Sequence, residues 1–170
     1  MDVIKYMEQF FREVAQVIQK IDEDMKKEGW EHLYRSTVTA GLSKDLGQPD
    51  QWLPYWNFRI YSKNRKSNLI KAVSICYDSD KVEQPIIIAG LVEYKKPRND
   101  WNDYWAFWYL WLEDENKSKK LDGTVYQLKS SDKDYKEMVK RAKAFAYNIV
   151  DIKNEDDIKT KISNKLIELS

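Results

Sequence analysis

The sequence predicts an α+β fold, with one domain in which a long N-terminal helix and two C-terminal helices pack on an antiparallel sheet of five or six strands. Three observations support this. Apolar side chains recur at helical spacing over residues 2–28, the middle of the chain alternates with a period of two between short turns, and residues 131–169 return to helical spacing. The length of 170 residues suits one domain, 1–170, because no repeat or change in composition divides it.

Residues 2–28 form the first element, an amphipathic helix that we expect to end at Gly29. Its apolar stripe consists of Val3, Met7, Phe10, Phe11, Val14, Val17, Ile18, Ile21 and Met25. Most of these positions also fit a heptad, so a helix-helix dimer seam is the alternative. Phe11 and Ile18 widen the stripe, which favours packing on the chain's own sheet.

The strands are predicted from alternating apolar residues and from turn residues between them. A short strand is expected at 33–39, before an irregular loop at 40–54 that contains two glycines and two prolines. Further strands are expected at 55–62, 69–77, 85–94 and 123–129. The short polar turns at 62–68 and 78–84 indicate an antiparallel meander.

The aromatic run at 101–112 fits both periods. As a strand, it places Trp105, Phe107, Tyr109 and Trp111 on one face. As a helix, it places Trp101, Tyr104, Trp105, Trp108, Trp111 and Leu112 on one stripe. Aromatic density favours the strand, since bulky rings suit a pleated surface.

Two helices are predicted to close the chain. Ser131 with Asp134 three residues later has the pattern of a capping box, and apolar residues follow at helical spacing to Ile149. Asn154 and Asp157 repeat this cap before a last helix, whose apolar face consists of Ile158, Ile162, Leu166 and Leu169.

Composition limits the compartment and the partners. With 29 basic and 28 acidic residues the formal net charge is +1, so no global field attracts nucleic acid or an anionic membrane. The single cysteine, Cys76, cannot form a disulfide within the chain and favours a reducing cytosol. No signal-peptide pattern or membrane-length apolar run is present, so we expect a cytoplasmic protein without membrane association. The 23 lysines against six arginines suggest an AT-rich bacterial or phage genome.

One short motif suggests an enzyme. Glu93-Tyr94-Lys95 at the end of a predicted strand resembles part of the metal site of the PD-(D/E)xK nuclease fold, a likeness of three residues. It implies a metal-dependent nuclease or phosphodiesterase in which the carboxylate binds the ion and the lysine stabilises charge. A second acid should then lie within about 4 to 6 Å of Glu93. A hairpin centred near residue 81 would place Glu93 opposite Leu69, and Asp78 would then lie roughly 30 Å from Glu93. We therefore predict no catalytic site.

Other catalytic motifs are missing from the sequence. His32 is the single histidine, so any metal site would depend on carboxylates. There is no P-loop, GxGxxG, HExxH or CxxC pattern. We therefore predict no cofactor and no metal, and favour a protein that is not an enzyme.

The strand at 55–62 and its turn suggest nucleotide or nucleic-acid binding. Arg59, Lys63, Arg65 and Lys66 provide cations, and Tyr55 and Tyr61 lie among them. Binding there would weaken steeply with salt.

The favoured interpretation is a cytosolic, non-catalytic interaction protein that recognises a protein partner or a second copy of itself. Trp, Tyr and Arg dominate binding hot spots, so the predicted surface consists of Trp52, Arg98, Asp100, Trp101 and Trp105. The small size of the chain would suit a bacterial or phage conflict or regulatory protein, such as an immunity protein or an inhibitor.

Overall fold

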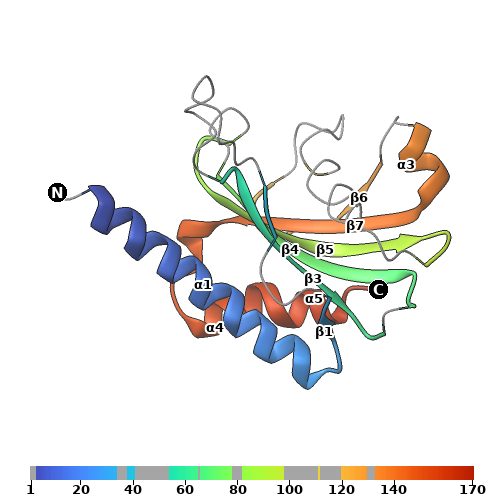
Figure 1. Ribbon diagram of the computed structural model, residues 1–170, viewed down its shortest axis with the longest axis horizontal. Helices are drawn as coiled ribbons and strands as arrows, with labels where there is room; N and C mark the ends of the chain where they lie inside the picture. Colours follow the sequence, from blue (N-terminus) through green and yellow to red (C-terminus); the bar gives the residue numbers. More distant parts are fainter. Residues whose placement is uncertain are drawn as a thin grey trace.

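The structure is a computed structural model of the whole chain (Figure 1). It describes residues 3–33, 38–40, 54–64, 66–77, 82–97, 111, 120–129 and 133–170, except for the side chains of 38–40 and 134. Residues 41–53 of the predicted loop at 40–54 lie outside the described residues. So does all but Trp111 of the aromatic run at 101–112, and the choice of strand or helix there stays open.

An antiparallel sheet forms the centre of the fold, in the order β1-β3-β4-β5-β7-β6, with β2 as a second partner of β3. The strands are β1 Glu31–His32, β2 Val38–Ala40, β3 Trp56–Ser62, β4 Leu69–Cys76, β5 Ile86–Tyr94, β6 Tyr126–Leu128 and β7 Val139–Asn148. The α+β prediction is confirmed. In place of one strand at 33–39, the described residues show two short strands, β1 and β2.

The meander from β3 to β5 has the predicted pairing. Leu69 lies opposite Glu93, and Cys76 at the other end of β4 lies opposite Ile86. Alternation along β3 buries Trp56, Phe58 and Ile60 in the cluster on one face of the sheet. The turn lengths and the period of two therefore determine the register.

Helices cover one face of the sheet (Figure 1). Helix α1, Val3–Lys27, ends before Gly29, whose φ of 75° suits a residue without a side chain. The C-terminal helical segment consists of α4 Glu155–Asp157, the π-helical η4 Ile158–Ser163 and α5 Asn164–Glu168. The predicted Asn154 cap is confirmed, because its side chain accepts a hydrogen bond from the Asp157 N–H.

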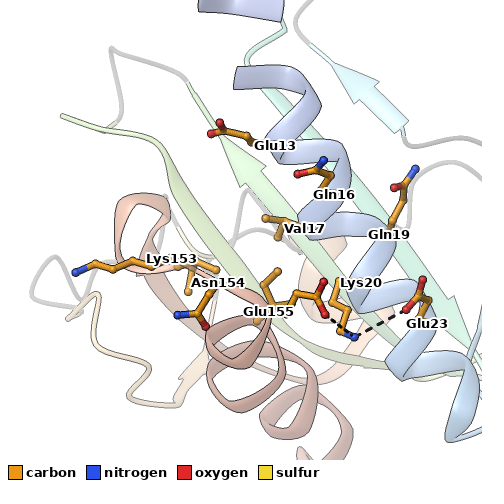
Figure 2. Close-up of a pocket in the computed structure, with 11 residues that line it drawn as sticks. Glu13, Gln16, Val17, Gln19, Lys20, Glu23, Lys153, Asn154 and Glu155 are labelled. Atoms are coloured by element: carbon orange, nitrogen blue, oxygen red, sulfur yellow. Dashed lines mark ion pairs between the residues drawn. The ribbon is translucent and has the colours of Figure 1, made fainter. Parts of the chain in front are cut away.

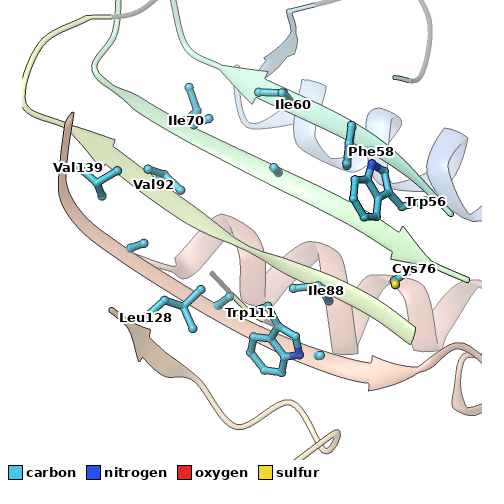
Figure 3. Close-up of a cluster of buried hydrophobic side chains, with 14 of the residues drawn as sticks. Trp56, Phe58, Ile60, Ile70, Cys76, Ile88, Val92, Trp111, Leu128 and Val139 are labelled. Atoms are coloured by element: carbon cyan, nitrogen blue, oxygen red, sulfur yellow. The ribbon is translucent and has the colours of Figure 1, made fainter. Parts of the chain in front are cut away.

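The sheet separates two clusters of buried side chains. Under the helices lie Val14, Ile18, Ile21, Met25, Trp30, Tyr61, Val73, Ile75, Ile87, Ala89, Phe145, Ile158, Ile162 and Leu166. Figure 3 shows the other cluster, which includes Trp56, Phe58, Ile60, Ile70, Cys76, Ile88, Val92, Trp111, Leu128 and Val139. Heptad positions such as Val14 and Ile21 are buried in the first cluster, so much of the predicted stripe packs inside the molecule.

The predicted helix at 131–149 is wrong over most of its length. A short helix, α3 Lys133–Met138, leads into β7, and Ile149–Asp151 forms the 3-10 helix η3. Ala142, Ala144 and Ala146 are fully buried on one face of β7. Alanine fits either period, so hydrogen bonding to β5 and β6 decides the conformation.

In the part of the chain that the structure describes, no helix has both the length and the apolar composition needed to cross a bilayer.

Candidate functional site: the basic end of the sheet

Several strand ends meet at one end of the sheet, drawn on the right in Figure 1. There β3 ends, β4 begins with Leu69 opposite Glu93 of β5, and Glu93 lies opposite Arg141 of β7. Adjacent strands are about 5 Å apart, so the four strand ends from β3 to β7 span roughly 15 Å. The antiparallel order thus joins segments that are far apart in the sequence.

Basic side chains gather at this end, which we call the basic end. The described cations there are Lys63, Lys66, Lys95, Lys96, Lys129, Lys133, Lys136, Lys140 and Arg141. The acids of the same segments are Glu31, Glu93, Asp134 and Glu137. By formal charge these nine cations and four acids sum to +5, although the whole chain carries only +1. All eight lysines are exposed, so their charges face solvent.

Glu93 lies within this cationic group as the acceptor of two charged hydrogen bonds. Lys140 Nζ donates to Oε1 at 2.7 Å, and Arg141 Nε donates to Oε2 at 2.6 Å. These hydrogen bonds, from Lys140 first and Arg141 second, lower the pKa of Glu93. The carboxylate is therefore ionised at neutral pH, with a cation on each oxygen.

The predicted nuclease residues have structural contacts here. Lys95 is exposed, and its Nζ donates to the Lys136 carbonyl oxygen at 2.6 Å. Within the described ranges, no three His, Cys, Asp or Glu side chains gather to form a metal site. Asp78 lies outside those ranges, so metal-dependent catalysis by Glu93 and Lys95 stays a prediction.

Lys63 and Lys71 both approach the Trp30 ring under the basic end. Their Nζ atoms lie 5.4 and 4.6 Å from the ring centroid. Lys71 is buried and donates to the Ile167 carbonyl oxygen at 2.7 Å, near the end of α5. Burial first, and the charge of Lys63 second, lower the pKa of Lys71 to about 8.

Arg59 lies inside the molecule, apart from the lysines of the neighbouring turn. Its Nη2 donates to Asp22 Oδ2 at 2.7 Å, and the Tyr61 hydroxyl donates to Asp22 Oδ1 at 2.8 Å. Burial, followed by the charge of Asp22, raises the pKa of Tyr61 well above its ordinary value. Of the predicted nucleic-acid residues, Lys63 and Lys66 are exposed at the basic end, and Arg65 is outside the described residues.

The predicted aromatic surface lies outside the described residues. This applies to Trp52, Arg98, Asp100, Trp101 and Trp105, so recognition of a protein partner through them stays a prediction. His32 is exposed on β1 and pairs with Tyr61 across the strands.

A groove of about 490 Å³ lies between α1 and the start of the C-terminal helices (Figure 2). Lys20 crosses it to Glu155, with Nζ and Oε2 3.2 Å apart, and lies 3.9 Å from Glu23. Glu13 and Lys153 also line it. This mixture of charges favours no single ligand class.

Sequence reasoning missed the contribution of α3 and β7 to the basic end. Lys136, Lys140 and Arg141 are distant in sequence from Lys63 and Lys66, and the predicted helix would have separated them from the meander. The high local density of lysine at 133–143 was the available signal, but its position required knowledge of β7.

The fold and this surface define an α+β protein with a strongly basic sheet end. Comparison of the chain with protein-family models, curated proteins and solved structures finds no match.

Proposed function

We propose that the protein is a non-catalytic nucleic-acid-binding protein that holds a sugar-phosphate backbone at the basic end of the sheet. The local formal charge of +5 is the observation that carries this proposal. Lysine ammonium groups bind phosphates as point charges, and release of the counterions around nucleic acid drives such association.

The composition of the basic end favours a nucleic acid over a protein partner. Protein interfaces have apolar centres, whereas nucleic-acid interfaces are more polar and positively charged. The exposed large apolar residues of the described chain are Val3, Ile4, Tyr6, Val125 and Val150, and none belongs to the segments of the basic end. The predicted protein partner at the aromatic surface is a separate proposal.

The buried state of nearby rings favours contacts to phosphates over stacking on bases. Trp30, Tyr61 and Tyr94 are buried. Tyr135 of α3 is half-buried, and its hydroxyl donates to the Leu128 carbonyl oxygen at 3.3 Å. Base stacking requires exposed ring faces, so we expect little dependence on nucleotide sequence and a strong dependence on salt.

Binding is favoured over cleavage because of the environment of Glu93. Both of its oxygens accept hydrogen bonds from cations. A carboxylate neutralised in this way is a weaker ligand for a divalent ion. As part of the proposal we place the protein in the cytosol, where the buried thiol of Cys76 would remain reduced.

The test is the binding of a labelled DNA duplex, measured by fluorescence anisotropy across a series of salt concentrations. We expect the double variant Lys66→Ala/Lys136→Ala to lower affinity about tenfold or more at low salt. We also expect it to reduce the slope of log affinity against log salt by up to about 2, since each lost phosphate contact removes roughly 0.9.

The matched control is Lys153→Ala/Lys159→Ala, which removes two exposed lysines of the C-terminal segment. It changes the total charge equally and should leave affinity within about twofold, because screened charges act locally. Absence of wild-type binding, or equal losses in the two variants, would contradict the proposed function.

A further inference from the structure

We propose that Lys140 and Arg141 form a phosphate-contact site, and that Glu93 is a built-in counter-anion that limits its affinity. This inference rests on the proposed function and assigns a specific site within the basic end. It is supported by backbone register, by unused hydrogen-bond donors and by the difference in exposure between the cations and the carboxylate.

The backbone explains why two consecutive residues reach the same carboxylate. Side chains of neighbours in a regular strand point to opposite faces. Here Glu93 pairs with Arg141, whereas Tyr94 pairs with Val139, so β7 has one extra residue, Lys140, at this point. Such a bulge changes the direction of side chains, and it allows both Lys140 and Arg141 to contact Glu93.

The two cations retain donors for a further anion. An ammonium group has three N–H donors and a guanidinium group has five, and Glu93 accepts one from each. The side chains of Lys140 and Arg141 are 62% and 36% exposed, compared with 14% for Glu93. The carboxylate therefore lies deeper, and the cations are more accessible to a phosphate from solvent.

Glu93 has two opposing effects on such a phosphate. It orients the cations, but its negative charge repels the incoming anion and cancels part of their attraction. Because the bulge and the strand pairing already hold the backbone of both cationic residues, we expect the charge effect to dominate. Loss of the Glu93 charge should therefore strengthen the binding of nucleic acid.

The first experiment compares the wild type with Glu93→Gln, which keeps the shape of the side chain and removes its charge. We expect the affinity for the labelled DNA duplex to rise three- to tenfold at low salt, with a steeper salt slope. Thermal unfolding of both proteins checks that the variant is folded. Unchanged or weaker binding by folded Glu93→Gln, with normal wild-type binding, overturns this inference and leaves the proposed function standing.

A second set of variants tests whether the gain acts through the two cations. In the background Lys140→Met/Arg141→Met, we expect Glu93→Gln to change affinity by less than twofold. An equal gain in that background would show a general charge effect and would overturn the assigned site.

Poly-L-glutamate as a competitor separates the two kinds of anionic partner. We expect it to displace the duplex poorly at equal concentrations of charge. If labelled poly-L-glutamate binds tightly in a direct anisotropy titration and the wild-type protein shows no DNA binding, an acidic protein partner replaces the nucleic acid, and both the proposed function and this inference are overturned.

Discussion

At the residue scale, buried charges show most clearly how tertiary contacts change side-chain chemistry. In the sequence, Lys71 and Arg59 stand in alternating strand patterns that give no sign of their partners. In the structure Arg59 is paired with Asp22 of α1, and Lys71 donates to a carbonyl oxygen near the end of α5. Both contacts connect the meander to the helices that cover it, so these polar groups help to specify how the layers pack.

Lys71 should make the stability of the protein depend on pH. Its pKa is about 8 in the folded protein, below the ordinary lysine value of 10.5 that we take for the unfolded chain. Below pH 8 both states are protonated, and the cost of burying the charge is fully present. Between pH 8 and 10.5 the unfolded state binds more protons, so this residue makes folding more favourable as pH rises. The full effect is on the order of 3 kcal/mol, at about 1.4 kcal/mol per pKa unit.

The measurement is the free energy of unfolding in urea from pH 7 to 10 for the wild type and Lys71→Met. We expect the wild type to gain stability relative to the variant as pH rises, because the variant lacks the titrating group. Lys66→Met, which removes an exposed charge, is the control. A difference between the wild type and Lys71→Met that does not vary with pH would contradict the lowered pKa.

At the element scale, β7 is the case in which local preference and final structure disagree. Its sequence, VKRAKAFAYN, is rich in lysine and alanine, which favour helices. In the fold it lies between β5 and β6 and pairs with both. The small alanines also suit a strand that is covered on a closely packed face, with Ala144 opposite Gly90. Pairing therefore overrides propensity over these ten residues.

This explanation predicts the behaviour of the segment in isolation. A synthetic peptide of residues 131–149 should form helix in aqueous trifluoroethanol, as measured by far-UV circular dichroism, because no partner strand is present. Replacing Ala142 and Ala144 by glycine should lower its helicity, at a cost of about 1 kcal/mol for each residue. A strand spectrum from the monomeric peptide would mean that β7 is determined locally.

At the scale of the whole molecule, the fold gathers positive charge at one end of the sheet, although the composition of the chain is nearly neutral. The chain has a formal charge of +1 and the residues of the basic end sum to +5, so all other residues together sum to −4. A charged surface or polymer encounters this local field and not the average, because salt screens charges beyond about 10 Å at 0.1 M.

Chromatography can test this uneven distribution without a biological ligand. We expect the wild type to bind a sulfonate cation-exchange resin at neutral pH and low salt despite its small net charge. Lys66→Ala/Lys136→Ala should elute at clearly lower salt than Lys153→Ala/Lys159→Ala, although the two variants have equal net charge. Co-elution of the two variants would show that retention follows net charge alone.

The sequence by itself determined the amphipathic helix α1, the meander from β3 to β5 with the register of β4 against β5, and the capped C-terminal helix. These features depend on neighbouring residues, because period, turn length and capping are local. Tertiary structure decided that residues 139–148 form a strand, that Arg59 pairs with Asp22, and that Lys63 and Lys140 lie at the same end of the sheet. Each of these depends on contacts between distant segments, and no local period encodes such contacts. They form only where their free energy outweighs the chain entropy that is lost when the intervening loop closes.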